Sequence, residues 1–202
     1  MKTVLVAADG FFHPPLFARR ALKSVLHQLE GFSFSAISSL EQLPENLGEF
    51  DALVVYLHHK TLSAAALEKL DSFVANGGGL LGIHSATASY KQTAHYFEIL
   101  GGRFTGHGKV EPFTVAPLRR TDVFHDIPAF EVVDELYFHE TQPGIEVHFV
   151  TRQKDEEVPV VWTYAYGRGR VCYAVPGHRT ATMNSAAYQT LLKQGVRWVA
   201  NA

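Results

Sequence analysis

The chain has 202 residues, of which 47% are hydrophobic and 19% charged, and its formal net charge is −2. This length and composition predict one domain with a single core, spanning residues 1–202. The near-neutral charge offers no basic surface for nucleic acid or an anionic membrane, and no run approaches the ~20 apolar residues of a membrane helix. We therefore expect a small-molecule ligand, and neither nucleic acid nor a membrane as partner.

Cysteine usage and the N-terminus indicate a cytoplasmic location. Cys172 is the single cysteine, so no internal disulfide can form. The first residues, MKTVLVAADG, lack the apolar stretch and cleavage site of a signal peptide. A homodimer is compatible with this composition, which does not by itself require one.

The first hundred residues predict alternating strands and helices. Short apolar runs typical of buried strands occupy residues 3–8, 32–37, 51–57 and 79–83. Apolar residues at helical spacing occupy 16–29, 64–75 and 88–100, and Ser63 is the expected N-cap of the second helix. This alternation predicts an α/β fold with a mostly parallel central sheet covered by helices on both faces.

The second half is less regular. Residues 111–118 and 146–152 have the pattern of strands, and the segment 121–142 between them is rich in turns, acids and aromatics. Residues 158–164 and 170–175 flank a glycine-containing turn and predict a β-hairpin. A helix over residues 186–200 ends the predicted fold.

Polar residues follow several of the predicted strands. An open parallel sheet binds ligands beyond the carboxyl ends of its strands, and the polar residues there are Asp9, His13, His58, His59, His84, Ser85 and His178. Histidine titrates near neutral pH and can act as an acid, a base or a metal ligand. We favour a functional role for His178, which a Pro-Gly turn holds at a strand end, whereas a solvated or capping role suits at least one of His58 and His59.

Other candidates lie outside these strand ends. His107 follows a glycine-rich stretch that allows close approach to a ligand but also suits an ordinary turn. On a strand, Glu135 and His139 would share one face and form a ligand wall, or simply a solvated face. Tyr137 could stack on a sugar ring or belong to the core, and Arg19 could anchor a substrate or lie on a solvated helix face.

Several of these segments resemble one family. The stretches are GGGLLGIHSA at 77–86, GGRFTGH at 101–107, DELY at 134–137, PVVW at 159–162, GRGRVCY at 167–173 and GH at 177–178. In this order they resemble the ThuA-like trehalose-utilisation family. The resemblance implies a class I glutamine amidotransferase-like fold, a flavodoxin-like three-layer sandwich. It also implies a role in the metabolism of trehalose and related disaccharides, beside dehydrogenases that form 3-keto sugars.

The resemblance also bears on the corner after residue 83. Amidotransferases of this fold carry Gly-x-Cys-x-Gly there, with a later histidine as base; here His84 takes the place of the cysteine and His178 that of the base. Cys172 lies inside an apolar run and is expected to be buried and inert. Glutamine hydrolysis through a thioester is therefore not expected. Ser85 lies one residue past the corner, where we expect it to cap the following helix rather than act as a nucleophile.

Our leading hypothesis is a carbohydrate enzyme that acts on a sugar or keto-sugar by histidine acid/base or metal-assisted chemistry. The expected catalytic residues are His84, His178 and Glu135, and the two histidines could also bind a divalent metal such as zinc. The expected substrate contacts are His13, Arg19, Ser85, His107, Tyr137 and His139. The alternative is a non-catalytic sugar-binding or partner module on a degenerate amidotransferase fold.

Overall fold

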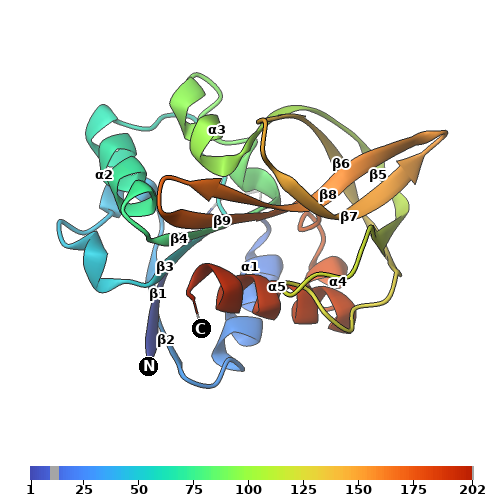
Figure 1. The fold of residues 1–202 in the computed structure, drawn as a ribbon, viewed down its shortest axis with the longest axis horizontal. Helices are drawn as coiled ribbons and strands as arrows, with labels where there is room; N and C mark the ends of the chain where they lie inside the picture. The colour runs from blue at the N-terminus through green and yellow to red at the C-terminus, as the bar shows by residue number, and fades with distance from the viewer. Residues whose placement is uncertain (10–13, 202) are drawn as a thin grey trace.

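The computed structural model describes residues 1–9 and 14–201, in which nine strands form one sheet with the order β2-β1-β3-β4-β9-β8-β7-β5-β6 (Figure 1). The strands are β1 (Lys2–Ala7), β2 (Phe32–Ile37), β3 (Ala52–Val55), β4 (Gly79–Ile83), β5 (Gly102–Pro117), β6 (Phe130–Thr141), β7 (Glu146–Gln153), β8 (Glu156–Tyr166) and β9 (Gly169–Ala174). The helices are α1 (Leu16–His27), α2 (Ala64–Ala75), α3 (Ala94–Leu100), α4 (Thr180–Met183) and α5 (Ala186–Val199), with short 3-10 helices η1 (Leu40–Gln42), η2 (Leu47–Glu49) and η3 (His84–Ala86).

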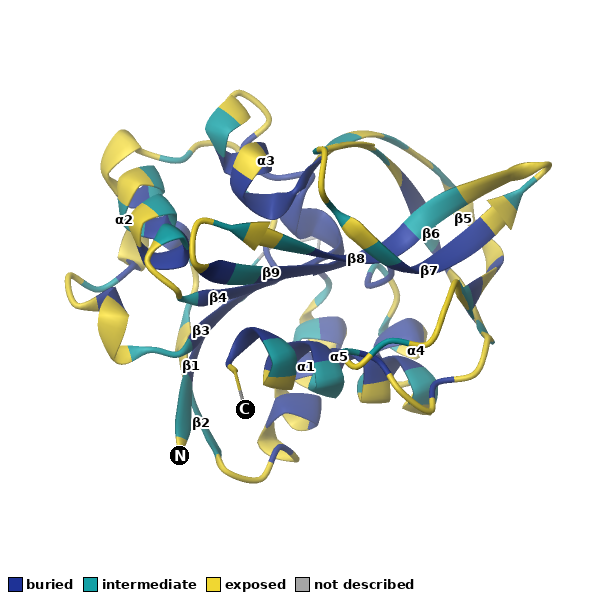
Figure 2. Cartoon of the chain, in the orientation of Figure 1, coloured by how far each residue is buried: buried dark blue, intermediate teal, exposed yellow. Residues whose placement is uncertain are grey.

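Half of the sheet is parallel. β2, β1, β3, β4 and β9 pair in parallel, and this is the strand order 2-1-3-4-5 of flavodoxin-like folds. β3 and β4 are buried on both faces, as the continuous apolar runs predict. Helices α2 and α3 cover one face, and α1, α4 and α5 cover the other (Figure 1). The three-layer arrangement is thus present in this half, with the buried strands between the helices (Figure 2).

The expectation of a mostly parallel sheet is wrong. β9-β8, β8-β7, β7-β5 and β5-β6 all pair antiparallel, so four of the eight neighbouring pairs have that direction. The predicted hairpin accounts for β8 and β9, but β6 occupies the segment expected to be rich in turns. Residues 130–141 form a strand because they pair with the sixteen-residue strand β5. Local sequence does not reveal this partner.

The helix expected over residues 88–100 begins only at Ala94. The single O–H of Ser89 has two carbonyl acceptors within reach, those of Leu57 and Ser85, at 2.9 and 3.0 Å. Tyr90 has a φ of 52°, which lies outside the α-helical region. The expectation that Ser85 caps this helix is therefore wrong, since Ser85 lies inside η3. By contrast, Ser63 caps α2 as predicted, because its hydroxyl accepts a hydrogen bond from the amide of Ala66.

None of the described helices is long and apolar enough to span a membrane. The core of the described residues is one cluster that runs through both halves of the sheet. At the junction of the two halves, Trp162 of β8 packs on Tyr173 of β9, with ring centroids 4.4 Å apart. This contact packs the first antiparallel strand against the last parallel one.

Candidate functional site

His84 lies at the corner where β4 ends. Its φ is 44°, a left-handed conformation that a non-glycine residue adopts only at a cost of about 1–3 kcal/mol. The residue has no exposed surface, and its Nδ1 lies 2.8 Å from the carbonyl oxygen of Val175. A carbonyl can only accept, so Nδ1 carries a proton, and in the neutral form of the ring the lone pair is at Nε2.

His178 follows β9, the strand that pairs with β4. Since the two strands run parallel, their carboxyl ends bring His84 and His178 together, with ring centroids 5.7 Å apart. The turn before His178 is fixed from two sides, because the Tyr56 hydroxyl donates to the Gly177 carbonyl and the Tyr188 hydroxyl donates to that of Pro176. The expectation of a histidine held by a sharp turn at a strand end is met in this arrangement.

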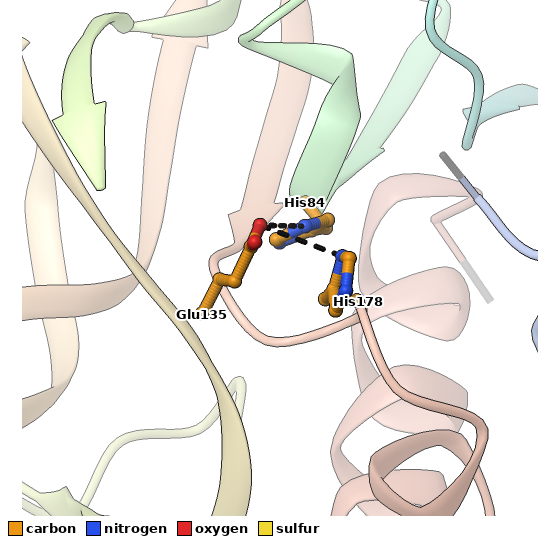
Figure 3. Close-up of side chains that lie close together, drawn as sticks. All are labelled: His84, Glu135 and His178. Carbon is orange, nitrogen blue, oxygen red and sulfur yellow. Dashed lines mark ion pairs between the residues drawn. The ribbon is translucent and has the colours of Figure 1, made fainter. Parts of the chain in front are cut away.

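Glu135 comes from β6 and reaches both histidines (Figure 3). Its Oε2 lies 3.8 Å from His84 Nε2 and 3.4 Å from His178 Nδ1. The carboxylate is largely buried, with 12% of the side chain exposed, against 16% for His178. The ligand atoms of these three residues all lie within 4.8 Å of one another. We name His84, Glu135 and His178 the His-Glu-His centre.

Asp134, the neighbour of Glu135, holds the loop that carries His178. It is fully buried and accepts hydrogen bonds from the amides of Gly177, His178 and Arg179, at 3.3, 2.9 and 3.1 Å. Burial raises the pKa of this carboxyl, while the amide donors oppose the rise. Two successive residues of β6 thus hold the His178 loop and face its imidazole. Asp134 was not among the residues expected at the site, because its partners are backbone amides that no side-chain motif marks.

Tyr137 and His107 border the centre. The Tyr137 ring is buried and packs on that of His84, with centroids 4.0 Å apart. His107 is about half exposed, and its Nδ1 lies 3.8 Å from Glu135 Oε1. Register shifts in β5 between Phe104 and Gly106 and between His107 and Val110 interrupt its pairing with β6 here. Such irregularities re-aim side chains, and they place His107 beside the carboxylate.

The other expected substrate contacts lie around this centre or outside it. His139 hydrogen-bonds Thr87 Oγ1 through Nε2 at 2.9 Å and packs against Trp162. Burial lowers the pKa of His139 to about 3, so it stays neutral at physiological pH. Ser85 is fully buried, with no hydrogen bond to its hydroxyl among the described residues. His13 lies outside the described residues.

Arg19 joins a second polar group, at the ends of β1 and β3. Its Nη1 donates to Asp9 Oδ1 at 2.9 Å, and His59 Nε2 lies 3.8 Å from Asp9 Oδ2. The strand order reverses at β1, and in such sheets this switch point is a common ligand position. Burial raises the pKa of Tyr56, the tyrosine that holds the His178 turn, and the Arg19 charge opposes this rise.

Cys172 is buried on β9, as expected. Burial raises the pKa of its thiol to about 12, which keeps it protonated and unreactive. A cavity also lies at the opposite end of the sheet, where Lys2, Asp51, Lys69 and Glu45 are among its lining residues. These four charges form two ion pairs, Lys2 with Asp51 and Lys69 with Glu45.

The fold and the site define an α/β protein whose reactive side chains gather at the carboxyl ends of parallel strands. The model of the ThuA family, described as trehalose utilisation, matches residues 3–199, and the chain belongs to this family. No curated protein matches the chain.

Solved structures share the fold at low sequence identity. A putative ThuA-like protein from Bacteroides uniformis ATCC 8492 is 19% identical with a TM-score of 0.83, over 98% of this chain and 91% of that one. One from Parabacteroides merdae ATCC 43184 is 18% identical with a TM-score of 0.85, over 99% and 90%. A cytoplasmic protein from Salmonella typhimurium LT2 is 13% identical with a TM-score of 0.72, over 98% and 99%.

Proposed function

We propose that the protein is an enzyme that acts on a sugar or keto-sugar, with the reaction at the His-Glu-His centre. The observation that carries the proposal is the position of the Glu135 carboxylate between His84 and His178, 3.8 and 3.4 Å from their ring nitrogens. Three polar side chains from distant segments are withdrawn from water at one point, which costs stability and is typical of functional sites. Membership of the trehalose utilisation family supports the substrate class.

The centre contains groups that can transfer protons. His84 Nδ1 is occupied by the Val175 carbonyl, so Nε2 is the atom that can take a proton from a substrate. Glu135 would stabilise the imidazolium that forms, and His178 could return a proton to the leaving oxygen. The same three groups also suit metal-assisted chemistry.

Glutamine hydrolysis does not fit the site. A thioester route needs a thiolate at the corner, and the residue there is His84. Cys172, the sole cysteine, is buried inside β9 with a pKa of about 12. We therefore place this protein outside the glutaminase reaction of the amidotransferases.

We propose that the substrate lies against Tyr137, His107 and the Arg19–Asp9 pair. Tyr137 packs on His84 and His107 lies beside Glu135, and Arg19 pairs with Asp9 after the end of β1. His13, Ser85 and His139 remain predicted contacts. The small-molecule carbohydrate partner, a cytoplasmic location and a homodimer also belong to the proposal, and similarity to the cytoplasmic protein from Salmonella supports the location.

The test is turnover of 3-keto disaccharides and their parent sugars by wild type and by Glu135→Gln. The substitution keeps the shape and removes the charge between the histidines, so we expect a fall of about 10²–10⁴-fold. His95→Asn is the matched control, because His95 is another histidine paired with carboxylates, Asp71 and Glu98, outside the centre. Unchanged turnover in a folded Glu135→Gln protein would contradict the proposal. Sugar binding without any turnover by the wild type would favour a binding module.

A further inference from the structure

We infer that His84 Nε2, His178 Nδ1 and a carboxylate oxygen of Glu135 form a binding site for one divalent cation of the zinc class. The inference rests on the proposed function for its role in a reaction, because the site is the His-Glu-His centre itself. Occupancy by a metal can nevertheless be measured without any sugar. A bound cation would favour the metal-assisted route over direct proton exchange between these side chains and the substrate.

The tautomer of His84 prepares it as a ligand. Its Nδ1–H donates a hydrogen bond to the Val175 carbonyl at 2.8 Å, and this orientation points Nε2 toward Glu135. A metal-bound histidine characteristically donates its other ring N–H to a carbonyl or carboxylate in this way, since that fixes the ring and raises its basicity. The carboxylate opposite is also an electron-pair donor, and a cation between the two would be bound by both.

The spacing of the three groups suits a small cation. With zinc bonds of 2.0–2.2 Å, two ligand atoms of a tetrahedral site lie about 3.3 Å apart. The observed separations from Glu135 Oε2 are 3.4 Å to His178 Nδ1 and 3.8 Å to His84 Nε2, and no pair of ligand atoms exceeds 4.8 Å. The three side chains face one another (Figure 3), and side-chain rotations would bring them to the spacing of a zinc site.

The surrounding structure holds each ligand in place. Val175 orients the ring of His84, and the carboxylate of Asp134 fixes the backbone of His178 through its amide. Glu135 is adjacent to Asp134, and its own amide donates to Asp134 Oδ1 at 2.9 Å. Such outer contacts lower the conformational entropy lost when a cation binds.

The ligand set resembles catalytic rather than structural zinc sites. Two histidines and one glutamate leave a fourth position for water or substrate, whereas structural sites are closed by four protein ligands. A cation there would polarise a carbonyl or hydroxyl oxygen of the sugar as a Lewis acid. His107 is half exposed, and its Nδ1–H donates a hydrogen bond to the Gly108 carbonyl at 2.7 Å. It therefore borders the site, and we do not include it among the metal ligands.

Another histidine cluster shows why proximity to carboxylates is insufficient. His95 Nδ1 bonds Glu98 at 2.7 Å and its Nε2 bonds Asp71 at 3.0 Å. Both ring nitrogens are engaged by acids, which raises the pKa of His95 and favours the charged ring. A protonated imidazole has no lone pair for a metal. This cluster therefore provides the matched negative control.

The experiment is metal binding by the chelator-stripped protein. Zn²⁺ binding is measured by calorimetry, and Co²⁺ is added as a spectroscopic probe of tetrahedral coordination. The variants are His84→Asn, whose side chain tolerates the left-handed corner, Glu135→Gln and His178→Asn, with His95→Asn as control. We expect one ion per chain, a loss of about 100-fold or more in affinity in each centre variant, and no change in the control.

The outcomes separate this inference from the proposed function. Absence of stoichiometric binding, or binding that survives all three centre variants, overturns the metal site. Full sugar turnover by the stripped protein overturns the metal-assisted route while leaving the proposed function intact. Tight binding of one ion at the centre, lost in all three variants, supports the metal site even in a protein that turns over no sugar, a result that would instead contradict the proposed function.

Discussion

His84 shows how one residue can serve both fold and site. Its left-handed backbone turns the chain sharply after β4, and its buried ring occupies the space between Tyr137 and the His178 loop. The strained conformation persists because the Val175 hydrogen bond and the packing of Tyr137 hold the ring. A side chain at this corner therefore cannot be exchanged without affecting the loop that faces it.

Gly177 provides a test of this close packing. A Cβ at this position would lie 2.8 Å from Cβ of His84 and 3.1 Å from Ile83 Cγ2. We expect Gly177→Ala to lower the free energy of unfolding by about 1–3 kcal/mol and to reduce turnover, because His178 must shift. Urea denaturation measures the first effect. Gly48→Ala, whose added Cβ would meet only Asn46 at 3.8 Å, should leave both properties unchanged.

Cys172 provides a second residue-scale prediction. Its thiol is buried and its pKa is about 12, so at pH 8 the folded protein contains almost no thiolate. We expect no reaction with an aromatic disulfide reagent until denaturant is added, followed by release of one equivalent. Rapid labelling of the native protein would show that β9 opens readily at this point.

At the scale of elements, the loop between β9 and α4 depends on Asp134 of β6. This buried carboxylate accepts four backbone amides, those of residues 177–179 and of Glu135. It therefore joins the edge of the antiparallel ribbon to the end of a parallel strand. No other described contact fixes the three loop amides in this way.

We expect Asp134→Asn to destabilise the protein by about 2–4 kcal/mol, since its amide group would face two donors and leave them unpaired. Displacement of His178 should also reduce turnover and metal affinity. Thermal and urea unfolding, with zinc calorimetry on the folded fraction, measure these effects. Glu131→Gln, an exposed substitution on the same strand, is the control. A variant of wild-type stability would show that the loop is held elsewhere.

For the whole molecule, two buried histidines predict how stability depends on pH. Burial lowers the pKa of His139 to about 3 and that of His148 to about 4, against an ordinary value near 6.5. Below pH 6.5 these two histidines bind protons in the unfolded chain but remain neutral in the folded chain. The free energy of unfolding is therefore highest above about pH 6.5 and decreases as the pH is lowered. Each histidine contributes a decrease of up to about 1.4 kcal/mol per pH unit until its folded-state pKa is reached.

Urea unfolding at pH 7, 6 and 5 measures this dependence. His148→Gln should reduce the slope between pH 6 and 5, because it removes one of the two groups while keeping a partner for Thr163. His125→Asn, at an exposed position, should leave the slope as in the wild type. An unchanged slope in His148→Gln would place the pH dependence in other groups.

The local signals of the sequence predicted the parallel half of the fold well. Apolar runs marked β1 to β4, helical spacing and Ser63 marked α2, and turn residues marked the β8-β9 hairpin. They did not predict β6, because it pairs with residues of β5 that lie 15 to 39 positions away in the chain, from Val115↔Phe130 to Gly102↔Thr141. The sequence also did not predict the late start of α3. Ser89 hydrogen-bonds Leu57, just after β3, and Tyr90 has a left-handed φ.

The sequence by itself placed His84 and His178 after predicted strands, and the family resemblance placed them at the two paired positions of the crevice. It also determined that the corner carries no thiol. Only the tertiary structure decided that Glu135 lies between the two imidazoles and that Asp134 holds the His178 loop. The reason is physical: β6 reaches the centre through the antiparallel ribbon, whose register shifts and curvature arise from packing between strands far apart in the chain.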